Sequence, residues 1–138
     1  MKIEYLREKD IKEVCALLRQ CFPNSQIKDD FDFQMIDKNY DIVLVAKIED
    51  HVVGHIWIQK QYDFYKHAFY FYLMYVCVDI KYRKQGIATS MLKQVELLKK
   101  QQQVSHIMFT SGNQRTEAIS LYQKLGFQKK DSSLFIKL

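Results

Sequence analysis

The sequence predicts an α/β (α+β) fold in which a central sheet carries helices. Segments with strand-like and helix-like patterns follow one another in the order β-α-α-β-β-β-α-β-α-β. One long apolar strand also runs through a glycine turn directly into an amphipathic helix. A chain of 138 residues normally folds as one unit and buries about two-thirds of the surface exposed when unfolded. We therefore expect a single domain over residues 1–138.

The N-terminal third is predicted to form one short strand and two helices. Residues 3–6 are the strand. Residues 9–22 are predicted to be a helix because their apolar side chains recur on one face, and Asp10 and Pro23 are placed to cap and end it. Residues 27–39 show a weaker helical spacing.

The middle of the chain is predicted to supply the central strands. Residues 42–48 and 52–62 flank a short polar turn and are expected to pair as a hairpin. Residues 69–78 are almost continuously apolar, which is typical of a strand covered on both faces. A helix over 87–100 follows, with apolar residues on one side and lysines on the other.

The C-terminal third completes the predicted order. It contains a strand over 104–110, a helix over 116–125 and a last strand over 133–138, whose residues 134–136 resemble a sheet edge. Because a free edge can pair with a second copy, both a monomer and a homodimer are compatible with the sequence.

Composition limits the compartment and the ligand. The net charge of +5 suits an anionic ligand, but it would also suit nucleic acid. No apolar run approaches the ~20 residues of a membrane helix, and the N-terminus lacks a signal-peptide core, so we expect a cytoplasmic protein without a membrane partner. Cys15, Cys21 and Cys77 are expected to be reduced core residues, and no Cys or His spacing indicates a metal site.

The glycine turn at residues 82–88 carries the clearest functional signal. It reads Tyr82-Arg83-Lys84-Gln85-Gly86-Ile87-Ala88 and opens the helix over 87–100. The first N–H groups of a helix lack partners, the helix dipole favours negative charge there, and Gly86 permits close approach. The turn is predicted to bind phosphate. A plain β–α connection is the alternative, and neither a P-loop nor a dinucleotide fingerprint occurs.

A second motif lies in residues 110–127 and contains Asn113, Ala118, Leu121-Tyr122 and Leu125-Gly126-Phe127. Together with Arg83-x-x-Gly86-x-Ala88, it resembles the GNAT family of N-acetyltransferases. The resemblance is strong in the second half of the chain and looser in the first. It implies a mixed, mostly antiparallel central sheet of six to seven strands flanked by about four helices.

The resemblance also implies an activity. It is the direct transfer of an acetyl group, in a ternary complex, from acetyl-CoA to an amine of a small molecule or peptide. The turn would hold the pyrophosphate, and the end of the central strand would pair with the pantetheine arm. The residues implied to bind acetyl-CoA are Val76, Val78, Arg83, Lys84, Gln85, Gly86, Ile87, Ala88, Thr89, Asn113 and Tyr122.

Tyr122 occupies the position of the family's general acid. A phenol with a pKa of ~10 can protonate a thiolate with a pKa of ~8.5 only if it is well placed, and the alternative is a tyrosine of the core. Asn113 could bond the pantetheine amide or cap the next helix.

The general base stays open. Residues 69–78 contain no carboxylate, and the remaining candidates are His55, Asp79 and Glu117, a water chain, or an amine that arrives neutral. Cys77 as an acetyl-carrying nucleophile is a weaker alternative, because nothing adjacent to it lowers its pKa.

Two other functions remain as alternatives: an acyl-CoA sensor without transferase activity, and a nucleic-acid-binding module. The acceptor would be chosen by residues 23–39, 63–67 and 133–138. The first of these contains Asp29, Asp30, Asp32 and Asp37, which would attract a cationic acceptor unless they form a solvated helix face.

Overall fold

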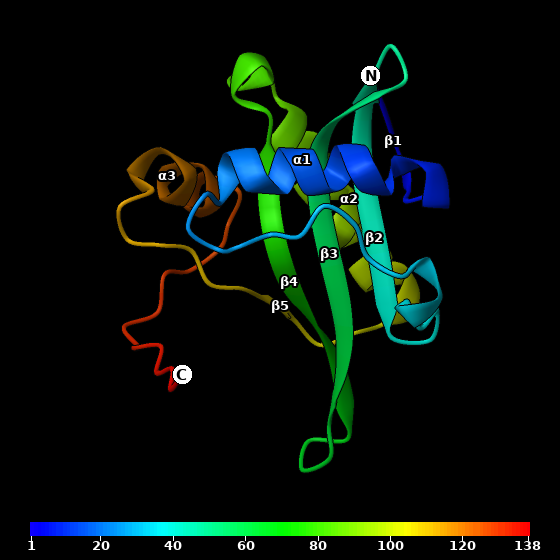
Figure 1. The fold of residues 1–138 in the computed structure, drawn as a ribbon. Coiled ribbons are helices and arrows are strands. Elements are labelled where there is room, and N and C mark those ends of the chain that lie inside the picture. Colours follow the sequence, from blue (N-terminus) through cyan, green and yellow to red (C-terminus); the bar gives the residue numbers. More distant parts are fainter.

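The computed structural model describes all 138 residues as a five-stranded sheet in the order β1-β2-β3-β4-β5, with α1 on one face and α2 on the other (Figure 1). The strands are β1 (Lys2–Tyr5), β2 (Asp41–Ile48), β3 (His51–Asp63), β4 (Ala68–Val78) and β5 (Ile107–Met108). The α-helices are α1 (Ile11–Cys21), α2 (Ile87–Gln102) and α3 (Thr116–Lys124), and three short 3-10 turns cover Glu8–Asp10, Phe33–Met35 and Ile80–Tyr82.

The sheet is mixed. Strands β1 to β4 pair antiparallel with their sequence neighbours, whereas β5 pairs parallel to β4. The predicted class and the mostly antiparallel sheet are therefore confirmed, with five strands and three α-helices instead of the larger numbers expected.

Alternating side chains of the central strands supply two cores. On β2, Val43 and Val45 pack on the α1 side, while Leu44 and Ala46 pack on the α2 side. Both faces are covered, which explains why these strands lack the polar alternation of a half-exposed sheet. Gly54 belongs to the α2 side, where a Cβ would lie 2.8 Å from the Met91 sulfur, so the bare backbone lets α2 approach the sheet closely. None of the helices combines the length and apolarity that crossing a membrane requires.

Two predicted elements are wrong. Residues 27–39 form an irregular segment with one 3-10 turn, because their carboxylates bond nearby backbone N–H groups: Asp30 accepts from Phe31, and Asp32 accepts from Gln34. Such local bonds compete with helix formation. Residues 133–138 form no strand, and residues 134–136 are more than three-quarters exposed.

The predicted strand over 104–110 is shortened to two paired residues, Ile107 and Met108. The chain leaves β4 directly afterwards.

A buried lysine joins β1, β2 and the start of α1. The Lys47 Nζ lies 2.8 Å from both Glu4 Oε1 and Asp10 Oδ1, and its side chain is 4% exposed. Asp10, predicted as a helix cap, instead accepts the Arg7 backbone N–H through its other oxygen. Burial would raise the pKa of Asp10, but the bonds from Lys47 and Arg7 outweigh it and lower that pKa.

Replacing Lys47 by Met is expected to destabilise the fold by about 3–5 kcal/mol, because it leaves the buried Asp10 carboxylate without its partner. Urea unfolding would measure the change. Lys9, which lies 3.6 Å from Asp50 but is half exposed, provides the matched control. Lys9→Met should change stability by less than about 1 kcal/mol. Equal losses in both variants would mean that the buried network contributes no more than a surface pair.

Candidate active site

A cleft opens where β4 and β5 part. The two strands pair only at Phe71–Ile107 and Tyr72–Met108, so the β5-facing edge of β4 has no strand partner beyond Tyr72. The cleft has a volume of about 420 Å³. Its walls come from four segments: Cys21 to Ser25 at and after the end of α1, Tyr72 to Val76 on β4, Phe109 to Gly112 after β5, and Gln114, Arg115 and Tyr122 before and within α3.

A bulge in β4 shapes one wall of this cleft. Tyr75 adopts a φ of 52°, and the β3–β4 register shifts between His55 and Trp57, so β4 carries an additional residue there. The His55 ring lies behind the bulge, with Nδ1 2.8 Å from the Tyr75 carbonyl oxygen. His55 is fully buried, and its Nε2 has no hydrogen-bond partner.

Burial lowers the pKa of His55 to about 4, although the bond to the Tyr75 carbonyl favours the charged form. His55 is therefore neutral near pH 7, and its Nδ1–H donates to that carbonyl. The side chain does not line the cleft, which leaves it as a support of the bulge.

The stability of the fold should fall as the pH decreases from about 6.5 to about 4. The unfolded chain binds a proton on His55 from about 6.5 downward, whereas the folded chain resists it to about 4, so acid favours unfolding by up to roughly 3 kcal/mol. Urea unfolding at a series of pH values would measure this. The loss should shrink in His55→Asn and persist in His51→Asn, a control at an exposed histidine. An unchanged slope in His55→Asn would contradict the assignment.

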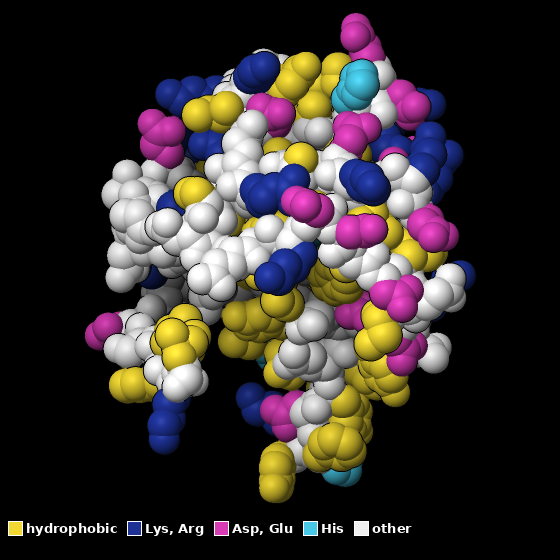
Figure 2. Space-filling view, in the orientation of Figure 1, with side chains coloured by type: hydrophobic (Ala, Val, Ile, Leu, Met, Phe, Trp, Pro, Cys, Tyr) yellow, Lys and Arg dark blue, Asp and Glu magenta, His cyan; other side chains and the backbone are white.

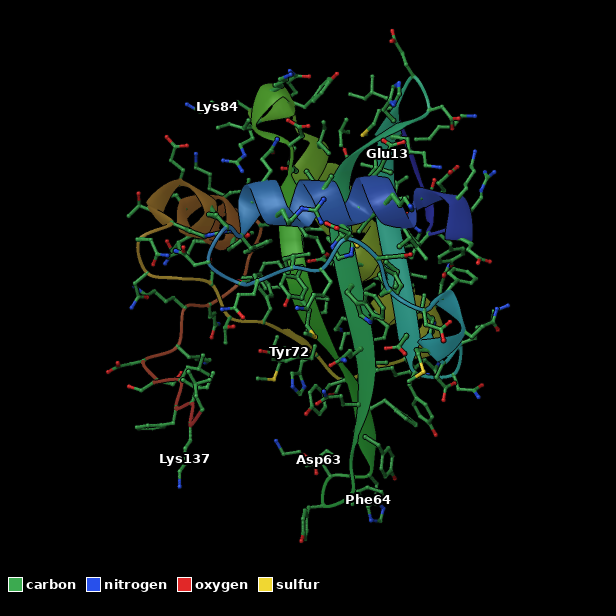
Figure 3. All side chains as sticks on the ribbon, in the orientation of Figure 1. Glu13, Asp63, Phe64, Tyr72, Lys84 and Lys137 are labelled. Carbon is green, nitrogen blue, oxygen red and sulfur yellow. The ribbon has the colours of Figure 1, made fainter.

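The glycine turn presents a row of free backbone donors. The N–H groups from Lys84 to Thr89 make no hydrogen bond within the protein. Gly86 is the N-cap of α2 with a φ of 82°, and a Cβ built there would meet no atom within 4 Å. Figure 3 shows Lys84 at the end of β4 where this turn lies, and Tyr72 farther along the strand. Free donors at a helix N-terminus beside open space are suited to an anion.

The side chains of the turn point in different directions. The Arg83 guanidinium turns back to β4, where Nε donates to the Val78 carbonyl at 3.0 Å. The exposed Lys84 lies 3.8 Å from Glu117 of α3. Ile87 is buried in the α2 core, while Gln85 is exposed. The Arg83 Nε–H is therefore already occupied, whereas the backbone N–H groups of the turn have no partner within the protein.

Tyr122 lies on α3 and lines the cleft. Its ring packs edge-on against Phe109, with 4.8 Å between centroids, and its hydroxyl has no hydrogen-bond partner within the protein. Burial raises the pKa of Tyr122, so the phenol keeps its proton at neutral pH.

Val76 lines the cleft, whereas three further candidates from the sequence lie outside it. Asn113 is exposed and does not line it. Asp79 accepts the Lys81 N–H at 2.9 Å, and Glu117 is exposed beside Lys84. No carboxylate, lysine or histidine lines the cleft.

The sequence did not indicate that Arg115 and Cys21 form part of the cleft wall. The Arg115 Nη2 donates to the Cys21 carbonyl at 2.7 Å, and its guanidinium covers the Phe22 ring at 4.3 Å. Arg115 directly precedes α3 and Cys21 ends α1, so they are 94 residues apart in the chain. No local pattern signals this contact.

A mixed sheet that parts beside a turn of free backbone donors is an architecture suited to a domain that binds an anionic ligand. Residues 11–127 match the acetyltransferase (GNAT) family, and the chain belongs to that family. The family uses acetyl-CoA as the acyl donor. The family resemblance noted in the sequence is thereby confirmed.

Two curated relatives are similar over most of the chain. An acetyltransferase of Sodalis glossinidius (strain morsitans) is 29% identical over 99% of this chain and 93% of its own length. Human N-acetyltransferase 8 is 31% identical over 66% of this chain, which spans about 40% of the human protein.

Solved structures share the fold. A transcriptional regulator from Bacillus halodurans C-125 superimposes with a TM-score of 0.88 at 21% identity, over 99% of both chains. An aminoglycoside acetyltransferase from an uncultured soil metagenomic sample reaches 0.85 at 18% identity, over 99% of this chain and 95% of that one.

Proposed function

We propose that this protein transfers the acetyl group of acetyl-CoA directly to an amine of a small molecule or peptide. The observation that carries the proposal is the run of unpaired N–H groups from Lys84 to Thr89, next to a cleft bordered by the unpaired edge of β4. The Arg83–Val78 bond fixes this turn at the end of that strand. A pyrophosphate at the turn would let the pantetheine arm run along β4 toward the bulge.

The cleft also supports a specific placement of the arm. The Val78 carbonyl already accepts from Arg83, so Val76, which lines the cleft, is the better partner for a pantetheine amide. The thioester would then lie between Tyr75 and Tyr122, both in the cleft wall. Asn113, being outside that wall, is left to the outer part of the cofactor or to the entry of α3.

The chemistry needs one proton donor and one proton acceptor. The amine nitrogen attacks the thioester carbonyl, a C–N bond forms, the C–S bond breaks, and the thiolate takes the Tyr122 proton. The amine proton leaves to water, since no carboxylate or imidazole lines the cleft. Solvent then reprotonates Tyr122. The acceptor therefore has to lose its own proton before attack, either on the way in or to water within the cleft.

The acidic residues of 27–39 give little support for a cationic acceptor. Asp29 pairs with Arg19 at 2.8 Å, and Asp30, Asp32 and Asp37 each accept a neighbouring backbone N–H. An amine acceptor such as an aminoglycoside, the substrate class named for one similar structure, would instead meet the cleft wall from Pro23 to Ser25, where Asn24 and Ser25 are polar.

Calorimetric titration of acetyl-CoA, paired with S-acetylpantetheine, tests the proposal. Acetyl-CoA should bind with micromolar affinity, about −8 kcal/mol, and S-acetylpantetheine much more weakly because it lacks the pyrophosphate. Thiol release in the presence of an aminoglycoside, a polyamine and a peptide would then identify the acceptor class. Absence of acetyl-CoA binding by the folded protein would reject the proposal.

A sensor that binds acyl-CoA without transferring it is the second candidate, and it is favoured because no carboxylate, lysine or histidine in the cleft wall could act as a general base. Micromolar binding without thiol release for any amine would select this candidate. A nucleic-acid-binding module has less support, because Figure 2 shows acidic and basic side chains interspersed over the face drawn.

A further inference from the structure

Cys21 lies in the cleft wall beside a second cysteine and an arginine. Its sulfur is 3.6 Å from the Val78 carbonyl oxygen, to which the thiol donates, and 3.7 Å from Arg83 Nη2. Cys77, on β4, directly precedes Val78 and belongs with Cys21 to the core on the α1 side of the sheet. The residue is 7% exposed, and that exposure is toward the cleft.

Cys77 and the nearby arginines favour negative charge on Cys21, whereas the Val78 carbonyl, which accepts from the Cys21 thiol, favours its neutral form. Cys77, together with Arg83 and Arg115, lowers the pKa of Cys21 to about 7 against the opposing effect of burial. The neighbouring Cys21 and burial raise the pKa of Cys77. Burial also raises the pKa of Cys15, in the α1 core. One sulfur of the three is thus both ionisable near neutral pH and open to the cleft.

We propose that Cys21 is a nucleophilic thiolate that exchanges with small disulfides entering the cleft, and that Cys77 resolves the resulting mixed disulfide. In the first step the Cys21 thiolate attacks one sulfur of R–S–S–R, forming Cys21–S–S–R and releasing R–S⁻. In the second step the Cys77 thiol gives up its proton and attacks the Cys21 sulfur. The Cys21–Cys77 disulfide forms, and a second R–S⁻ leaves. Two thiols are oxidised, and the small disulfide is reduced to two thiols.

The exchange would change the cleft itself. An adduct on Cys21 would fill part of the wall that faces Tyr122, and an internal disulfide would fix the end of α1 to β4 beside the bulge. It would also remove the thiolate that Arg83 Nη2 contacts. Oxidation is therefore expected to compete with acyl-CoA, a consequence that rests on the proposed function, whereas the thiol chemistry does not.

Reaction of the native protein with the aromatic disulfide dithiobis(nitrobenzoate) tests the inference. Wild type should release two thionitrobenzoate anions per chain in a fast phase and retain no adduct by mass spectrometry. Cys77→Ser should release one and retain one adduct. Cys21→Ser should react at least about tenfold more slowly, since the two remaining thiols, Cys15 and Cys77, do not line the cleft. The matched control, Cys15→Ser, should behave like wild type.

Two results would overturn the inference. A fast phase that persists in Cys21→Ser would remove Cys21 as the nucleophile, and an adduct that wild type retains would remove Cys77 as the resolving thiol. A brief pulse of iodoacetamide on wild type, followed by peptide mapping, gives the same answer without a variant. Alkylation should fall on Cys21 first, and alkylation of Cys15 or Cys77 ahead of it would reject the proposal. Labelling of Cys21 needs no acyl transfer. If Cys21 is labelled first and acetyl-CoA added before the pulse gives no protection, the thiol chemistry stands and only its link to the proposed function fails.

Discussion

Replacing Gly86 by Val is expected to weaken acetyl-CoA binding by at least about 100-fold, or roughly 2.7 kcal/mol. Gly86 has a φ of 82°, which branched side chains rarely adopt, and the space that its missing Cβ leaves open is where the turn would receive a phosphate. A Val side chain would both strain the turn and fill that space. Calorimetric titration of acetyl-CoA into the variant would measure the loss.

Gly126 supplies the matched control. It has a φ of 95° and equally open surroundings, but it lies after α3 and does not line the cleft. Gly126→Val should therefore carry similar backbone strain and retain acetyl-CoA affinity within about threefold. Thermal unfolding of both variants would show whether the two substitutions strain the fold equally. Equal loss of binding in both variants would attribute the effect to the fold and not to the turn.

Replacing Tyr122 by Phe is expected to lower kcat by about 100-fold or more while leaving acetyl-CoA affinity nearly unchanged. The substitution removes the hydroxyl but keeps the ring that packs on Phe109, and that hydroxyl has no hydrogen bond within the protein to lose. The thiolate would then leave without its proton. Steady-state kinetics with a saturating amine, together with titration of acetyl-CoA, would separate the two effects.

Tyr72 provides the corresponding control, because it also lines the cleft and carries a phenol (Figure 3). Tyr72→Phe should retain kcat within about threefold. Full activity in Tyr122→Phe would show that Tyr122 is a packing residue and not the proton donor. A large loss in Tyr72→Phe instead would assign the proton donor to β4.

Much of the fold follows from local patterns. The strands predicted over 42–48, 52–62 and 69–78 and the helix over 87–100 agree closely with β2, β3, β4 and α2. The apolar side chains of these elements recur with a clear period or form a continuous run, and they are buried on the two faces of the sheet. The predicted helix over 27–39 fails because its apolar spacing is real but its aspartates bond the backbone locally. Apolar periodicity alone does not show whether such local hydrogen bonds will prevent a helix from forming.

The site divides in a similar way. The phosphate-type turn and Tyr122 are encoded in short motifs, so the sequence locates them, and the structure places the latter in the cleft wall. Cys21 and Arg115 meet only because α1 ends where α3 begins, a contact between distant segments. The direction of the Arg83 side chain depends equally on tertiary contacts, since its acceptor is a carbonyl that β4 brings to it. A charged residue in a sequence motif does not show in which direction its side chain points.

The short β4–β5 pairing has a consequence for how the protein behaves in solution. Beyond Tyr72, β4 presents backbone groups that no neighbouring strand satisfies, and such groups are a template on which another chain can add. A ligand lying along that strand would cover the template, so occupancy and solubility become linked. The empty protein is therefore expected to self-associate more readily than the occupied one, so a ligand bound along β4 would also limit aggregation.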